Sequence, residues 1–140
     1  MKTGNFITAI FFVLIVFCGG CKSTAAVSPY TGFTKTDASG NIISADPNDW
    51  KNIPQITGAL AYPNPTTSGS VMLKFNLTAS AYVDIKVYRD DSTLELDYAP
   101  GVLAGSQTVL LDISKLQTGW IYKCYIFAGN SSTYGNISIP

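Results

Sequence analysis

The sequence predicts one all-β domain of seven short antiparallel strands in two packed sheets, which follows an N-terminal signal peptide and a flexible tether. Three observations support this prediction. After residue 56, apolar and polar residues alternate with the period of a β-strand, and turn residues interrupt the alternation about every ten residues. No stretch there has the spacing of an amphipathic helix, and 140 residues leave room for little more than one domain.

The first 20 residues have the layout of a signal peptide. Lys2 supplies a positive charge, and an apolar run of twelve residues extends from Phe6 to Phe17. Because a membrane-spanning helix needs about 20 apolar residues, the short run favours cleavage after export over a permanent span. We therefore expect residues 1–20 to be removed, with an uncleaved anchor and an ordinary secretory peptide as the alternatives.

The residues at the end of this segment predict lipid attachment. Gly19-Gly20-Cys21 resembles the bacterial lipobox, in which small residues precede a cysteine that is acylated and becomes the first residue of the mature protein. Cys18 stands where most lipoboxes carry an aliphatic residue. The resemblance implies that acyl chains on Cys21, each contributing about 0.8 kcal/mol per buried CH₂, hold the protein on a membrane of the bacterial cell envelope. Lys22 after the cysteine implies passage to the outer membrane, on its periplasmic or its surface side.

Residues 21–56 form the predicted flexible tether, since they are rich in Ser, Thr, Ala, Asn, Asp and Gly and show no helical period. A flexible chain of this length has a root-mean-square reach of about 30 Å. Residues 32–43 are expected to form a hairpin around Asp37–Asn41 if they pack on the domain. Asp46–Trp50 is expected to be a tight turn that docks its Trp at the domain boundary, because it lacks the roughly six to eight oxygen ligands of a calcium site.

Residues 57–140 carry the strands of the predicted domain. In the strand that follows Gly119, alternation places Lys123 outward and Tyr122, Cys124 and Ile126 inward. The strand count and spacing are typical of an immunoglobulin-like β-sandwich. The strands are centred on Leu60–Tyr62, Val71–Leu77, Val83–Tyr88, Leu94–Tyr98, Val109–Leu111, Trp120–Ala128 and Thr133–Ile139.

The cysteines are expected to form no disulfide within the mature chain. Of the three cysteines, Cys18 leaves with the signal peptide and Cys21 carries lipid, so Cys124 has no partner. The strand position of Cys124 predicts a buried and unreactive thiol, since no flanking cation or helix terminus is placed to activate it.

Four motifs follow one another in the domain: Tyr62-Pro63-Asn64-Pro65, Val83–Tyr88, Ala104–Val109 and Leu116–Tyr122. They resemble the C-terminal domain of type IX secretion cargo and the related immunoglobulin-like domain of flagellar hook-capping proteins, over roughly residues 59–140. The resemblance implies a seven-stranded sandwich. Gly135–Pro140 lacks the basic residues that end the sorting signals of this family. Removal of the domain would leave a tether of about 40 residues, which is too short to build a core, so we expect the sandwich to be the working part.

Charge and composition exclude several classes of function. Nine basic and nine acidic residues give a net charge of zero, which leaves no basic surface for nucleic acid. The absence of His excludes Ser-His-Asp and Cys-His catalysis and most zinc enzymes. We therefore expect no enzymatic activity, no cofactor and no metal. The acidic residues on outward positions or turns indicate a solvated face; they are Asp84, Asp90, Asp91, Glu95, Asp97 and Asp112.

The leading hypothesis is a membrane-anchored envelope lipoprotein that presents a non-enzymatic immunoglobulin-like domain for binding or for a structural role. Its partner, beyond the membrane held through Cys21, would be an envelope protein or a glycan. One alternative is a type IX secretion-linked surface protein whose domain is a sorting module. Another is carbohydrate binding by outward aromatic side chains, which otherwise pack across strands or on the tether; these are Tyr82, Tyr88, Tyr125 and Phe127.

Overall fold

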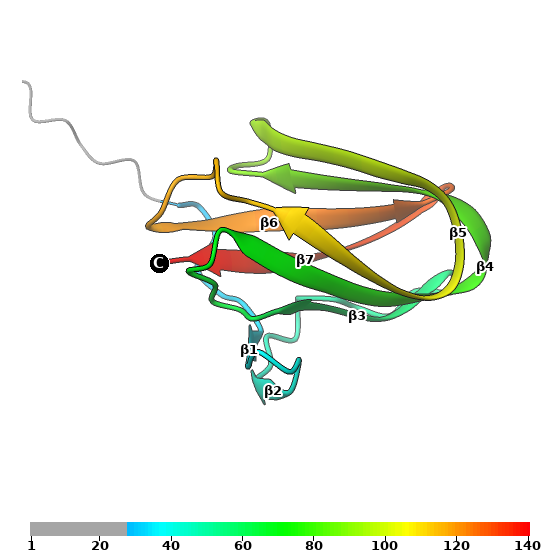
Figure 1. Ribbon diagram of the computed structural model, residues 1–140, viewed down its shortest axis with the longest axis horizontal. Coiled ribbons are helices and arrows are strands. Elements are labelled where there is room, and N and C mark those ends of the chain that lie inside the picture. Colours follow the sequence, from blue (N-terminus) through cyan, green and yellow to red (C-terminus); the bar gives the residue numbers. More distant parts are fainter. Residues whose placement is uncertain (1–27) are drawn as a thin grey trace, which may run out of the picture.

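The computed structural model describes residues 28–140, and this part of the chain is an antiparallel all-β structure without helices (Figure 1). The predicted all-β class is therefore confirmed. The predicted signal peptide and the lipid attachment site Cys21 lie outside the described residues. The strands within residues 28–140 are β1 (Lys35–Thr36), β2 (Ile42–Ser44), β3 (Ile56–Tyr62), β4 (Ser70–Tyr88), β5 (Leu94–Asp112), β6 (Trp120–Ala128) and β7 (Ser131–Ile139).

Strands β4 and β5 each run through 19 residues, where the sequence predicted two shorter strands. The first half of β4 pairs with β3 and with the second half of β5. The second half of β4 pairs with β6 and with the first half of β5. Gly101 and Gly105 between the halves of β5 take positive φ angles of 97° and 69°, so the paired strands bend instead of ending.

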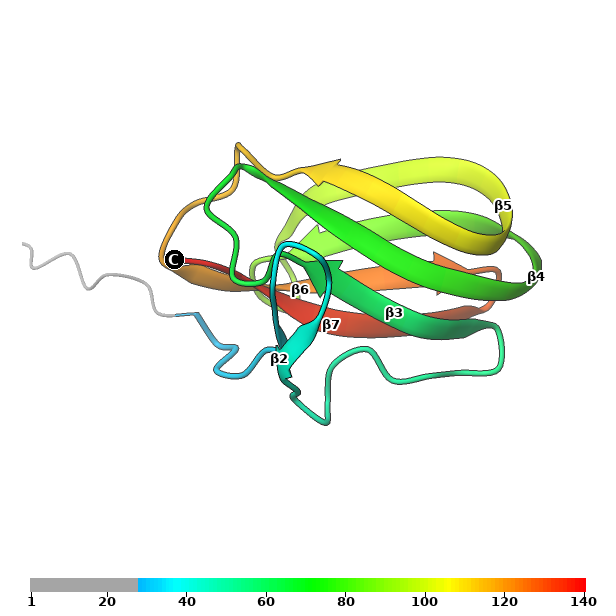
Figure 2. The same cartoon turned by 60° about the horizontal axis from the view of Figure 1, so that its bottom comes forward.

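The main sheet curls around the hydrophobic core. Its strand order is β3-β4-β6-β7, with β5 joined to β4. The strands β3 and β7 at the two ends of this order lie near each other without pairing, so the sheet curls round on that side. Figures 1 and 2 show β4 and β5 arching together at the end of the sheet that lies opposite the C-terminus.

Alternating residues of the strands fill the interior of this curl. In β6, Tyr122, Cys124 and Ile126 are fully buried, whereas Lys123 points outward, so the predicted orientation of this strand is confirmed. The other largest fully buried side chains are Phe75, Ile56, Leu73, Ile85, Leu111, Ile137, Val71, Val83, Val87 and Asn64.

Strands β1 and β2 form the hairpin that the turn signal predicted. The carboxylate of Asp37 accepts hydrogen bonds from the backbone N–H groups of Ser39 and Asn41, at 2.8 and 2.9 Å. The Asp37 N–H donates to the carbonyl of Asn41 at 3.0 Å, which closes the turn. The hairpin joins the main sheet through a bridge between Thr36 and Asn64.

Residues 28–55 pack on the main sheet, which differs from the flexible tether predicted for residues 21–56. The outer edge of β7 provides the physical reason, because its backbone groups have no further strand to pair with. The Trp50 N–H donates to the carbonyl of Tyr134 at 2.6 Å, and a carboxylate oxygen of Asp49 accepts the Asn136 N–H at 3.1 Å. The Trp50 side chain is 7% exposed and lies against Gly135, so the predicted docking of this Trp is confirmed.

Candidate functional site

One edge of β5 is open along the whole strand. Both halves of β5 pair with β4, and no other strand of residues 28–140 pairs with them. The edge of β7 differs, because residues of the N-terminal segment and Asn64 and Thr66 bond to its backbone. An open edge presents unpaired backbone N–H and C=O groups, which allow another extended chain to add as a strand.

Large apolar side chains are exposed along this open strand. Val102 and Leu110 are 69% and 61% exposed, and Leu94 and Tyr98 are each more than two-fifths exposed. Exposed edges usually carry Lys or Pro, which hinder association. β5 contains no Lys or Arg, and Pro100, its single Pro, lies at the bend. The edge therefore lacks basic residues, and its charged side chains are the acidic Glu95, Asp97 and Asp112.

A groove of about 260 Å³ lies between the two halves of β5. Its walls are Leu96, Asp97 and Tyr98 from the first half, and Leu110, Leu111 and Asp112 from the second half. The lining of the groove thus combines apolar residues with one acidic residue from each half of the strand.

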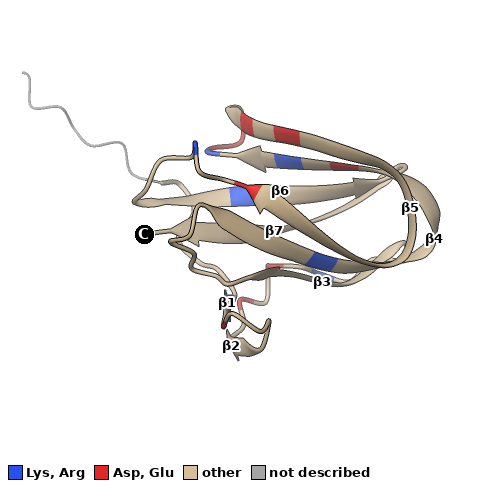
Figure 3. Cartoon of the chain, viewed as in Figure 1, with Lys and Arg blue, Asp and Glu red and all other residues tan. Residues whose placement is uncertain are grey.

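Both carboxylates of the groove are ionised at neutral pH. The Lys86 ammonium donates to Asp97 at 2.7 Å and lowers the pKa of that carboxyl. Hydrogen bonds from Ser114 lower the pKa of Asp112. Figure 3 shows several charged residues on the part of the sheet that holds the first half of β5 and the second half of β4.

The outward aromatic side chains form a cluster around Tyr125. The ring of Tyr88 meets that of Tyr125 edge-on at 5.7 Å, and the ring of Phe127 stacks on it at 5.7 Å. Tyr134 of β7 lies 5.4 Å away. The structure therefore brings together three of the four aromatic residues that the sequence placed outward. Their mutual packing fits the interpretation that they pack across strands.

Lys123 connects the beginning of the described chain to this aromatic cluster, because its ammonium lies over the rings of both Tyr30 and Tyr134. The Tyr30 hydroxyl donates to Asp91 at 3.0 Å, and burial, followed by this hydrogen bond, raises the pKa of Tyr30. The Lys123 ammonium lies 4.7 Å from the centre of the Tyr30 ring and 3.3 Å from the Asp91 carboxylate. The Ser28 hydroxyl donates to the carbonyl of Ile121 at 2.8 Å. These contacts fix the chain near the start of β6.

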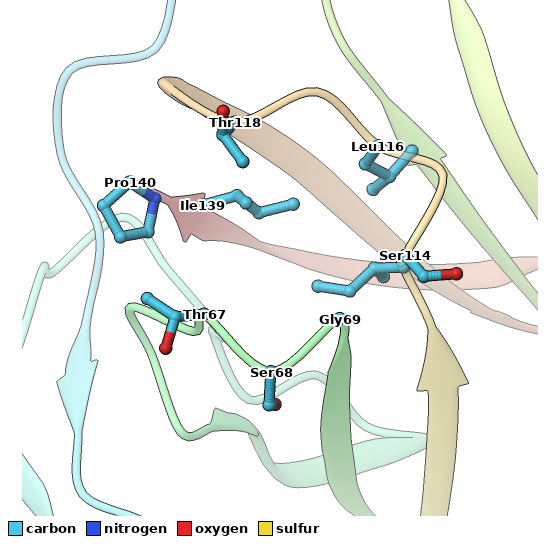
Figure 4. Close-up of a pocket in the computed structure, with 9 residues that line it drawn as sticks. Thr67, Ser68, Gly69, Ser114, Leu116, Thr118, Ile139 and Pro140 are labelled. Atoms are coloured by element: carbon cyan, nitrogen blue, oxygen red, sulfur yellow. The ribbon is translucent and has the colours of Figure 1, made fainter.

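A second hollow lies at the end of the sheet that holds the C-terminus (Figure 4). It has a volume of about 330 Å³, and none of its side chains is ionisable. Hydroxyl and small aliphatic groups line it, from the β3–β4 loop, the β5–β6 loop and the end of β7; they are Thr67, Ser68, Gly69, Ile113, Ser114, Leu116, Thr118, Ile139 and Pro140.

Asn64 joins three parts of the chain in the interior, a role that no local pattern of the sequence predicted. Its side-chain amide donates to the carbonyls of Thr34 and Asn136, both at 2.8 Å, and its oxygen accepts the Ser138 N–H at 2.9 Å. The side chain is fully buried. The motif Tyr62–Pro65 marked the position, but these partners lie 30 to 74 residues away in the chain, where no local pattern indicates them.

Cys124 and Asp90 have structural roles in the described chain. Cys124 is fully buried, and burial raises the pKa of its thiol far above neutral, so the thiol stays protonated. Asp90 accepts hydrogen bonds from Ser92 and Thr93 in the β4–β5 turn, which lower its pKa to about 2. Within residues 28–140 no group of three His, Cys, Asp or Glu side chains is placed to hold a metal ion. The same residues include no helix with the length and apolar character needed to cross a bilayer.

Comparisons of the chain with protein-family models, curated proteins and solved structures found no match.

Proposed function

We propose that the protein is a membrane-anchored envelope lipoprotein whose β-domain is a non-enzymatic module for binding another protein. Cys21 is the proposed lipid attachment site, and the outer membrane of a bacterial envelope is the proposed location. The open edge of β5 is the proposed binding surface. This edge is the observation that carries the proposal, because it combines free backbone groups, exposed apolar side chains and a groove.

The strand pairing supports an immunoglobulin-like arrangement for this domain. If the bent strands are divided at their bends, β3 joins the first half of β4 and the second half of β5 in one layer. The first half of β5, the second half of β4, β6 and β7 form the other layer. This gives seven strand segments in two antiparallel layers, as in sandwiches of that type.

The proposed occupant of the β5 edge is an extended segment of another protein that alternates apolar with basic residues. Strand addition gains main-chain hydrogen bonds, and alternate side chains give specificity. An apolar side chain fits between Leu96 and Leu111, and a neighbouring Lys or Arg lies close to Asp97 and Asp112. A second copy of the chain fits less well, because each β5 carries three acidic residues and no basic ones.

A peptide-binding measurement with full-length protein in detergent tests this proposal. The probes are an extended peptide that alternates valine with lysine and a matched peptide that alternates valine with glutamate. We expect the lysine peptide to bind, and Leu110→Lys to weaken this binding by about tenfold or more, which corresponds to about 1.4 kcal/mol. Ile43→Lys is the matched control, because Ile43 is similarly exposed but lies in β2. Equal binding of both peptides, no binding, or equal effects of both variants would contradict the proposal.

A further inference from the structure

We infer that the domain stands end-on at the membrane, with the end that holds the C-terminus against the lipid headgroups. This inference rests on the proposed lipid anchor at Cys21. The membrane-facing surface consists of the loops at residues 63–69 and 113–119 together with Pro140, and is called the end surface below. The hollow of about 330 Å³ opens on it.

The length of chain between the anchor and the domain sets the distance to the membrane. The described chain begins at Ser28, whose hydroxyl is already bonded to the carbonyl of Ile121. Seven residue steps separate Cys21 from Ser28, so these positions are at most about 25 Å apart whatever path the chain takes. The packing of residues 28–55 therefore replaces a tether of about 35 residues with a much shorter connection.

The point of attachment lies at one end of the sheet. Figures 1 and 2 show that the chain around residue 28, the C-terminus and the loops at 63–69 and 113–119 share this end. The bends of β4 and β5 and the β6–β7 turn lie at the opposite end. Since β6 has nine residues, the two ends are separated by about 30 Å along this strand. The opposite end, which carries the exposed pair Tyr82 and Val102, thus points away from the membrane.

The chemistry of the end surface suits contact with headgroups. Its two loops carry Lys115 as their single ionisable side chain, with Ser, Thr and Gln as the other exposed polar residues. Trp120 is half-buried beside these loops, and the Arg89 guanidinium, which pairs with Glu95 at 3.2 Å, lies 5.7 Å from the centre of its ring. Aromatic and basic side chains of this kind are enriched where proteins meet the membrane interface. The side of the domain instead carries Asp84 and Asp97, which anionic headgroups repel.

Fluorescence quenching of the native lipidated protein in vesicles that contain headgroup-spin-labelled lipid tests this orientation. Thr118→Cys places a fluorophore on the end surface, and Asn130→Cys places it on the β6–β7 turn; both positions are exposed. Cys124 is buried and stays unlabelled in the folded protein. We expect several-fold stronger quenching at residue 118 than at residue 130. A Gly/Ser insertion of 20 residues after Lys22 adds a reach of about 25 Å and is expected to reduce the difference.

The mass of the same samples separates failure of the inference from failure of the proposed function. Equal quenching at residues 118 and 130, in protein whose mass shows acylation at Cys21, would overturn the orientation and leave the anchor intact. If quenching is stronger at residue 118 than at residue 130 and the insertion leaves this difference unchanged, the short connection does not set the orientation of the domain. Absence of acyl mass at Cys21 would overturn both the anchor and the orientation.

Discussion

Asn64 connects the β3–β4 loop to the N-terminal segment and to β7 through hydrogen bonds. Its side chain makes three hydrogen bonds in a fully buried position, to Thr34, Asn136 and Ser138. Buried polar groups that lose their partners cost about 1–3 kcal/mol each, because water does not replace the lost bond. The contact between the N-terminal segment, β7 and the β3–β4 loop therefore depends on the Asn64 side chain of the Tyr62–Pro65 motif.

Asn64→Ala is expected to lower the free energy of unfolding by about 3 kcal/mol, since it leaves two carbonyls and one N–H unpaired. Urea unfolding of the full-length protein in detergent, followed by tryptophan fluorescence, measures this change. Asn130→Ala is the control, and we expect a change within about 0.5 kcal/mol because Asn130 is exposed in a turn. Similar effects of the two substitutions would show that the hydrogen bonds of Asn64 contribute little to the free energy of unfolding.

Asp49 gives the stability a defined pH dependence. Burial raises the pKa of this carboxyl to about 6 from an ordinary value of 3.8, although the N–H groups of Thr34 and Asn136 donate to it and oppose the shift. The folded protein therefore holds the Asp49 proton more tightly than the unfolded chain does. The contribution of Asp49 to stability is complete below pH 3.8 and is lost as the pH rises through about 6.

The free energy of unfolding is thus expected to fall by about 2–3 kcal/mol between roughly pH 4 and pH 7 because of Asp49. The carboxyls of Asp37, Asp90 and Asp91 have lowered pKa values, so their contributions change below this range. Urea unfolding across the range measures the slope, and Asp49→Asn is expected to remove it. A variant that keeps the wild-type slope would assign the pH dependence to another group.

The orientation of individual residues followed from alternation where a strand has one buried face. This reasoning placed Tyr122, Cys124 and Ile126 inward and Lys123 outward, as the structure shows. It gave no role to Asn64 or Asp49, because their partners lie far away in the chain. Such long-range polar contacts leave no periodic pattern in the sequence.

At the scale of elements, the docking of residues 46–50 on β7 depends on close approach between Trp50 and Gly135. A Cβ atom at position 135 would overlap the indole ring of Trp50. Gly135 has no positive φ angle, so its backbone conformation does not require glycine. Glycine is needed because the Trp50 ring leaves no room for a side chain at this position. Trp50 itself has a φ of 54°, a conformation that the hydrogen bond to Tyr134 supports.

Gly135→Ala is expected to lower the free energy of unfolding by about 1–3 kcal/mol, because the added methyl group meets a packed ring. In a Trp50→Ala background the same substitution is expected to have almost no effect, since the ring is absent. Unfolding of the wild type, both single variants and the double variant gives the coupling free energy. Additive effects of the two substitutions would contradict this packing.

The positions of the strands were easier to predict than their continuity. Alternation located the residues of β3, β4, β5, β6 and β7, but small residues suggested chain breaks within β4 and β5, whereas both strands continue through these places. Paired strands bend together there because each keeps its neighbour through the bend. The same limit applies to the candidate site, since an open edge is a property of strand order, which alternation does not define.

At the scale of the whole molecule, the structure shortens the connection between the proposed anchor and the domain. Composition alone predicted a flexible segment over residues 21–56, whereas the chain from Ser28 onward is bonded to the sheet. The individual contacts of this segment give little signal in the sequence, because a single Trp or Asp does not predict that a segment packs on a core. Together they set the end of the domain at which the lipid anchor is proposed to act.

The intact mass of the protein from native membranes tests the central claim, that an acylated Cys21 anchors this β-domain. We predict a chain that begins at Cys21 and carries the additional mass of several acyl groups. Cys21→Ser is expected to abolish the added mass, and Cys18→Ser is expected to retain it, because Cys18 leaves with the signal peptide. A mature chain without acyl mass, or one that begins at another residue, would contradict the account.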